Sequence, residues 1–352
     1  SSLATGRCTI KKRTFFAAGV VIVTAGALVA ARRSGLGEDL DWEAVDKPGQ
    51  IICVDGYGVH CVLQGEGPAV VLVHGFGGNI FSYRNVIPLL ARDHRVIAVD
   101  LKGCGYSERD AHTGLSHRDQ VAMLKGLLDN LGVERAAFIG HSLGGAVVQR
   151  FAATHPKMVD ALVLVASSTG DERWGEYLGR FVPSVFLLRP LVSALVGLTA
   201  AASCALQYSV AARDLAGRFS HMRFVSGRLL RLWTYDATTL TDDVRDGYLR
   251  PIRIRGTLTS ILRSVRETER DGAIDRSRIT KPVLLLYAAQ DRAVPLSAAD
   301  RLCELLPQAQ LVVIERAAHL LLEERSEECA RVSEGFLRDA VDRASAGPAT
   351  GT

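Results

Sequence analysis

The chain has 352 residues, of which 48% are hydrophobic and 23% charged, with 11 prolines and a net charge of +4. This composition excludes a disordered or collagen-like polymer and provides enough apolar residues for one large core or two domains. The positive charge is divided between residues 1–37 and 171–271, and aromatic residues are not interleaved with basic ones, so we expect no nucleic-acid partner.

An uncharged apolar segment at residues 14–31 has basic residues on both sides. As a helix it would be about 27 Å long, close to the hydrocarbon thickness of a bilayer. We therefore predict a single N-terminal transmembrane segment and a membrane-associated protein, with compartment and sidedness left open. A segment that is cleaved after secretion or organelle targeting is one alternative, because residues 29–31 have small side chains. A buried helix is the other.

Short apolar runs alternate with helical patterns after residue 50. Residues 51–54 and 59–63 flank the turn-forming residues 55–58 and predict a β-hairpin. Helical patterns, such as 118–131 and 146–154, lie between most of the later runs. These later runs have the continuous apolar character of strands that are buried on both faces: 69–73, 96–99, 136–139, 161–165, 283–287 and 311–314. We expect a mostly parallel sheet flanked by helices, with ligands near the C-terminal ends of its strands.

The run at 136–139 leads into Gly140-His141-Ser142-Leu143-Gly144, which fits the G-x-S-x-G nucleophile elbow. A sharp turn between strand and helix strains the serine backbone and lifts the hydroxyl above the sheet. The flanking glycines leave space where a Cβ atom would collide with neighbouring backbone. Ser142 is therefore predicted to be a nucleophile, and the alternative is an idle serine in a glycine-rich turn.

A serine hydroxyl needs a base to take its proton, and the base needs an acid to orient it. His319 lies in a loop after the run 311–314, where its ring can reach over the sheet, and is predicted to be the base. Asp291 follows the run 283–287 and is predicted to be the acid. Asp171, after the run 161–165, is its rival.

The glycine-rich segment at residues 74–78 follows the run 69–73, and its main chain can approach a substrate closely. We predict that the backbone amides of Phe76 and Leu143 form an oxyanion hole. A plain turn is the alternative. The remaining residues of the predicted site are expected to contact substrate, although ordinary packing is the alternative for each: His74, Gly75, Gly77, His141, Trp174 and Trp233.

Five motifs give the chain a resemblance to serine hydrolases of the α/β-hydrolase fold: residues 74–78, 100–107, 140–145, 290–291 and 318–319. The resemblance covers about residues 50–168 and 279–340. It is esterase-like or lipase-like, because the related epoxide hydrolases and haloalkane dehalogenases have aspartate at the position of Ser142. It also implies a helical cap in the long gap before residue 279 and a structural role for residues 100–107.

We therefore expect an α/β-hydrolase fold with an inserted helical cap and an N-terminal apolar helix. Residues 1–46 are predicted to form the anchor or targeting segment and a linker. Residues 47–168 and 279–345 are predicted to form the core, 169–278 the cap and 346–352 a tail.

The predicted activity is hydrolysis of small-molecule or lipid carboxylic esters with an apolar acyl or alcohol part, through an acyl-serine intermediate. We expect no metal or organic cofactor, and the seven cysteines show no legible disulfide or metal framework. Two alternatives stay open. The same triad can hydrolyse carbon–carbon, thioester or amide bonds, or catalyse perhydrolysis. The fold can also serve as a non-catalytic ligand-binding module. The oligomeric state is not predicted.

Overall fold

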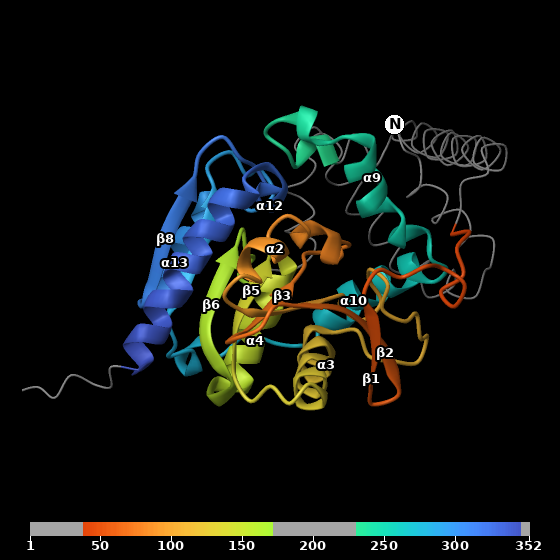
Figure 1. Ribbon diagram of the computed structural model, residues 1–352, viewed down its shortest axis with the longest axis horizontal. Coiled ribbons are helices and arrows are strands. Elements are labelled where there is room, and N and C mark those ends of the chain that lie inside the picture. The colour runs from red at the N-terminus through yellow and green to blue at the C-terminus, as the bar shows by residue number, and fades with distance from the viewer. Residues whose placement is uncertain (1–37, 172–229, 346–352) are drawn as a thin grey trace, which may run out of the picture.

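A computed structural model describes residues 38–171 and 230–345 (Figure 1). Its centre is an eight-stranded sheet of order β1-β2-β4-β3-β5-β6-β7-β8. The hairpin of β1 (Gln50–Val54) and β2 (Tyr57–Gln64) pairs antiparallel with β4, and the other neighbours are parallel. The remaining strands are β3 (Ala69–Val73), β4 (Arg95–Val99), β5 (Ala136–His141), β6 (Val159–Val165), β7 (Val283–Ala288) and β8 (Ala309–Ile314). The predicted fold class, an α/β-hydrolase fold with a mostly parallel sheet, is confirmed.

Helices cover both faces of the sheet, and a separate group of helices follows residue 230. One face carries α3 (His117–Asn130), α4 (Leu143–Thr154) and α11 (Leu296–Leu305). The other face carries α2 (Ile87–Leu90), α12 (Leu321–Glu324) and α13 (Ser326–Ser345). The group after residue 230 contains α9 (Asp242–Leu249) and α10 (Thr257–Thr268), and short 3-10 helices complete the described part: η1 (Ile80–Tyr83), η2 (Pro156–Met158), η4 (Ala237–Thr239), η5 (Pro251–Arg253) and η6 (Arg276–Arg278).

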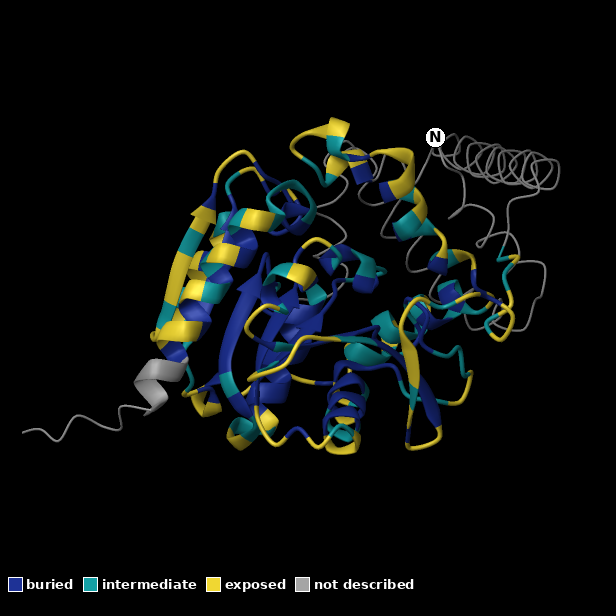
Figure 2. Cartoon of the chain, viewed as in Figure 1, coloured by how far each residue is buried: buried dark blue, intermediate teal, exposed yellow. Residues whose placement is uncertain are grey.

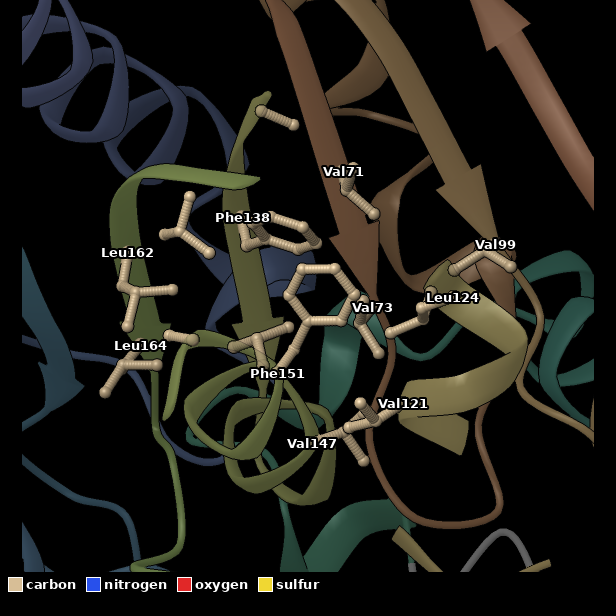
Figure 3. Close-up of a cluster of buried hydrophobic side chains, with 14 of the residues drawn as sticks. Val71, Val73, Val99, Val121, Leu124, Phe138, Val147, Phe151, Leu162 and Leu164 are labelled. Carbon is tan, nitrogen blue, oxygen red and sulfur yellow. The ribbon is translucent and has the colours of Figure 1, made fainter. Parts of the chain in front are cut away.

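The central strands are almost continuously apolar, since both of their faces are buried (Figure 2); Asp160, near the start of β6, is a half-buried exception. On β3, Val71 and Val73 point into the cluster that contains Phe138 and Phe151 (Figure 3). Leu72 points into the opposite cluster, beneath α2 and α13. Because successive side chains of a strand alternate between its faces, a continuous apolar run is the pattern that a central strand requires.

Strand β8 differs from this prediction because it lies at the edge of the sheet. Leu311 is 38% exposed and Val313 is 37% exposed, so one face of this apolar run is largely open. The sequence alone does not distinguish an edge strand from a central one when both are apolar.

Residues 38–41, which the sequence places in a linker, are fastened to the segment that leads into α10. The carboxylate of Glu38 accepts hydrogen bonds from the amides of Gly256 and Leu258, each at 2.8 Å. Leu40 forms a parallel β-bridge with Ile254. These contacts satisfy amide groups at the start of α10, where a helix has no internal acceptors.

The predicted membrane location is contradicted. In residues 38–171 and 230–345, no helix combines the length and the apolar character that a bilayer crossing needs. The segment at residues 14–31, which carried the prediction of a transmembrane or cleaved N-terminal segment, lies outside the described residues. Most of the predicted cap before residue 230, including Trp174, also lies outside them, and the division into domains stays a prediction.

His117, at the first turn of α3, supports a prediction about acid stability. Its ring is 5% exposed, and neither ring nitrogen has a hydrogen-bond partner within the described part of the chain. Burial, together with the nearby charge of Arg150, lowers the pKa of His117 from 6.5 to about 3. The unfolded chain therefore binds a proton that the folded chain rejects between these two values, so stability is present above pH 6.5 and is lost as the pH falls towards 3.

Replacing His117 by leucine should remove this contribution. Between pH 7.5 and 5, we expect the free energy of unfolding of the variant to fall by about 2 kcal/mol less than that of the parent protein. Urea unfolding at the two pH values measures the difference. The exposed His112, replaced by alanine, is the control and should leave the pH dependence unchanged. Equal losses in the His117→Leu variant and its parent would contradict the assignment.

Candidate active site

Ser142 lies at the turn between β5 and α4 in a strained backbone conformation, with φ of 53° and ψ of −117°. Its amide donates to the carbonyl of Val165 at 2.9 Å, which fixes the turn against β6. A Cβ atom on Gly144 would lie 2.2 Å from the carbonyl oxygen of Val73, so only glycine fits there. A Cβ atom on Gly140 would lie 2.6 Å from the carbonyl oxygen of Gly144. The local sequence thus produces the predicted elbow.

The structure brings the three predicted triad residues together from separate loops. The Nε2 atom of His319 lies 3.1 Å from the Oγ atom of Ser142, and its Nδ1 atom lies 2.8 Å from Oδ2 of Asp291. Ser142 is 1% exposed, and His319 and Asp291 are each 6% exposed. With the Nδ1 proton donated to the carboxylate, Nε2 is the acceptor for the serine hydroxyl. The arrangement can therefore move the hydroxyl proton to the imidazole.

Backbone amides fix the carboxylate of Asp291. Its Oδ1 atom accepts from the amides of Ala293 at 2.7 Å and Val294 at 2.9 Å, which leaves Oδ2 directed at the imidazole. The rival carboxylate, Asp171, is instead paired with Arg276 at 2.5 Å and accepts from the amide of Ile274 at 3.1 Å.

The glycine-rich segment after β3 packs directly against the elbow. A Cβ atom on Gly75 would lie 3.0 Å from Nδ1 of His141 and 3.1 Å from Cβ of Ser142. Leu143 is the first residue of α4, so its amide has no acceptor within the helix. Gly77 has a positive φ of 62°, which turns the chain beside this point. The oxyanion roles of Phe76 and Leu143, and the substrate contacts of Gly75 and Gly77, stay predictions.

His141 is part of the support for His319. Its Nε2 atom donates to the main-chain oxygen of His319 at 2.9 Å, and the two rings lie 4.9 Å apart. Burial and the nearby ring of His319 lower the pKa of His141 to about 3, so it is neutral near pH 7. We assign it to holding the His319 loop and not to the predicted substrate contact.

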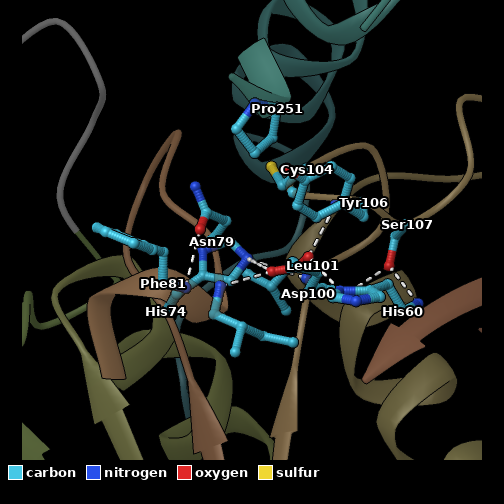
Figure 4. A network of polar contacts seen from close by, with 12 residues as sticks. His60, His74, Asn79, Phe81, Asp100, Leu101, Cys104, Tyr106, Ser107 and Pro251 are labelled. Atoms are coloured by element: carbon cyan, nitrogen blue, oxygen red, sulfur yellow. Dashed lines mark hydrogen bonds and ion pairs between the residues drawn. The ribbon is translucent and has the colours of Figure 1, made fainter. Parts of the chain in front are cut away.

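For His74, which is predicted to contact substrate, the structure shows main-chain partners instead. Its Nδ1 atom donates to the carbonyl of Gly75 at 2.8 Å, and its Nε2 atom accepts from the amide of Leu101 at 3.0 Å (Figure 4). Because both ring nitrogens have protein partners, and burial lowers the pKa of the ring, His74 is a neutral structural group. It joins the glycine-rich segment to the turn after β4.

Asp100, at the end of β4, is the centre of the network in Figure 4. Its carboxylate receives three N–H groups, from the amides of Ile80 and Tyr106 and from Nδ1 of His60, each at 2.7 Å. Burial by itself raises the pKa of this carboxyl, but the hydrogen bond and charge of His60 outweigh it and lower the pKa. The motif at residues 100–107 thus connects the hairpin, the glycine-rich segment and β4, as its predicted structural role requires.

Trp233 lies beside His319, with its ring edge-on at 6.2 Å. Its main-chain oxygen accepts from the amide of Leu320 at 3.0 Å. Another residue contacts the loop that carries His319, and no sequence motif indicates it. This residue is Glu324, whose carboxylate accepts a hydrogen bond from the amide of Ala318.

Comparisons with known proteins identify the fold of the chain. A family model described as the alpha/beta hydrolase fold matches residues 68–326. An uncharacterized hydrolase of Bacillus subtilis, YugF, is 29% identical over 73% of this chain and 85% of its own. A 2-hydroxy-6-oxononadienedioate/2-hydroxy-6-oxononatrienedioate hydrolase of Paraburkholderia phymatum is 30% identical over 71% of this chain and 80% of its own. The solved meta-cleavage product hydrolase of Pseudomonas fluorescens IP01 superposes with a TM-score of 0.65 at 23% identity, covering 83% of this chain and 98% of its own.

Proposed function

The chain belongs to the α/β-hydrolase fold family, and from this premise we propose that it is a serine hydrolase that cleaves a carbon–carbon bond next to a ketone. The observation that carries the proposal is the hydrogen-bonded sequence from Ser142 through His319 to Asp291. The substrate class is supported by the similarity to the Paraburkholderia phymatum hydrolase.

The chemistry of that relative's substrate points away from the ester hydrolysis expected from the sequence. A 2-hydroxy-6-oxo dienedioate is a dicarboxylic acid with a hydroxyl and a ketone on one carbon chain. It has no ester, thioester or amide bond, so water divides it only by breaking a carbon–carbon bond. Such a bond breaks when the leaving carbon can spread its electron pair over conjugated double bonds to an oxygen. We therefore favour the carbon–carbon alternative.

In the first half of the proposed reaction, Ser142 attacks the ketone carbon while His319 takes the hydroxyl proton. The oxyanion that forms is held by the amides of Phe76 and Leu143, next to a serine that is 1% exposed. The bond breaks from the tautomer in which the 2-hydroxyl proton of the substrate has moved to carbon 5 and carbon 2 is a ketone. The electron pair of the broken C5–C6 bond then passes through the C3–C4 double bond to the oxygen on carbon 2. The resulting dienolate takes the proton from His319, and the acyl group stays on Ser142.

In the second half, His319 takes a proton from water, and the hydroxide that results attacks the acyl-serine ester. Collapse of this second intermediate releases a carboxylic acid and returns the proton to Ser142. Asp291 keeps the imidazole in one tautomer and stabilises its cation in both halves. Every proton and bond is accounted for by the three side chains, the substrate and one water molecule.

A substrate panel tests the proposal. We expect kcat/KM for a 2-hydroxy-6-oxo-2,4-dienoate to exceed that for p-nitrophenyl esters by a factor on the order of 100. A buried site that hydrogen-bonds the polar groups of its substrate rejects a molecule that lacks these groups. Loss of the dienoate absorbance and release of p-nitrophenol measure the two reactions. Faster ester turnover would restore the ester prediction. Absence of turnover and of fluorophosphonate labelling at Ser142 would favour the ligand-binding module.

A further inference from the structure

The carboxylate of Glu324, the last residue of α12, joins two segments that are far apart in the sequence. Its Oε2 atom accepts from the amide of Ala318 at 2.8 Å. Its Oε1 atom accepts from the amides of Tyr235 at 2.6 Å and Asp236 at 2.8 Å. Three N–H donors on one carboxylate form a charge-assisted cluster, which is stronger than three neutral hydrogen bonds.

The bond to Ala318 lies on the N-terminal side of His319, and a second contact lies on its C-terminal side. There the amide of Leu320 donates to the main-chain oxygen of Trp233 at 3.0 Å. Residues 233–236 thus hold the peptide before and after the imidazole. The loop from 315 to 319 has no helix or strand of its own, so its conformation depends on such contacts.

The neighbouring carboxylate, Glu323, has other partners. It forms an ion pair with Arg84, the residue after η1, and receives a hydrogen bond from the hydroxyl of Tyr248 in α9 at 3.4 Å. The two residues therefore connect α12 to different parts of the molecule. Of these two carboxylates, the one of Glu324 joins Ala318, the residue before His319, to residues 235 and 236.

We propose that Glu324 is a positioning residue for His319. Through its carboxylate, the position of residues 233–236 determines how the imidazole is aligned with Ser142. This inference rests on the proposed function, because it requires His319 to be the base. Glu324 does not touch the substrate. It fixes the Ala318–His319 peptide so that Nε2 stays within proton-transfer distance of the serine hydroxyl.

The Glu324→Gln variant tests the inference. It replaces one carboxylate oxygen by an NH2 group, which then faces a backbone N–H and cannot accept a hydrogen bond from it. A small misplacement of a reacting group costs one to two orders of magnitude in rate. We expect kcat to fall by about 10-fold with KM within about twofold, and the second-order rate constant for labelling by a small fluorophosphonate to fall in proportion. A role in stability alone would lower the melting temperature without changing the labelling rate at 25 °C.

Two further variants complete the test. Glu327→Gln removes an exposed carboxylate one turn away and should label at the parent rate. If Glu324→Gln does not fold, Glu324→Asp retains the charge but is one methylene too short to reach both segments, and should label more slowly than the parent. Labelling of the folded Glu324 variants at the parent rate would overturn the inference. Failure of the parent protein itself to label would instead remove the proposed function.

Discussion

The Ser142→Ala variant should lose turnover of its best substrate by a factor of about 10⁴ to 10⁶ while it keeps KM within a few-fold. The expected loss is this large because the hydroxyl is the atom that forms the covalent intermediate, and no other serine hydroxyl is placed 3.1 Å from Nε2 of His319 among the described residues. The change removes one oxygen atom from a buried position and leaves the elbow intact. Steady-state kinetics and labelling by a fluorophosphonate both report it.

A matched serine shows that the effect belongs to this position. Ser297 is exposed on the first turn of α11, and its replacement by alanine should leave kcat and KM unchanged. Thermal melting of both variants confirms that they are folded. If Ser142→Ala retained more than a few per cent of the parent turnover, the covalent mechanism would have to be abandoned.

The second large effect is expected from Asp291→Asn. The Oδ1 position accepts from the amides of Ala293 and Val294, so the new amide keeps its oxygen there and presents its NH2 group to His319. An imidazole that faces this donor must carry its proton on Nε2, which then cannot take the proton of Ser142. A wrong tautomer of this kind lowers kcat by about 10⁴-fold. We expect this loss in kcat across the accessible pH range, measured on the preferred substrate.

Asp171→Asn is the natural comparison, because Asp171 was the rival acid. Its carboxylate pairs with Arg276 and not with His319, so this variant should lose stability through the broken ion pair but keep activity within a few-fold. A large loss of kcat in the folded Asp171→Asn variant, together with a mild effect of Asp291→Asn, would reverse the two assignments.

The sheet and the meeting of the triad were accessible from the sequence because they follow from local rules. Continuous apolar runs mark strands with two buried faces, and the C-terminal ends of parallel strands lie at one edge. Residues 142, 291 and 319 each follow such a run, so their convergence required no knowledge of packing. Edge strand β8 shows the limit of the rule, since Leu311 and Val313 are as apolar as their central counterparts.

The contacts that refine the site depend on tertiary structure and left no pattern to read. His74 stands in the glycine-rich motif, yet its partner amide belongs to Leu101, in the turn after β4. Glu324 is one of several acidic residues between positions 323 and 334, and its contacts with residues 235, 236 and 318 distinguish it. The membrane prediction, which depended on hydropathy at residues 14–31, is contradicted: no helix among the described residues is long and apolar enough to cross a bilayer.

The network around Asp100 restricts which substitutions positions 100 and 105 can accept. Gly105 has a positive φ of 53°, and a Cβ atom there would lie 2.0 Å from the Asp100 carboxyl group. The glycine therefore has space only for hydrogen, and the aspartate has room only while the glycine remains. Any side chain at position 105 would displace the Asp100 carboxylate. Replacing Asp100 by asparagine would place an NH2 donor where three N–H groups already point. Neither position can be exchanged first through a viable intermediate, so the pair should be inherited together wherever this turn survives.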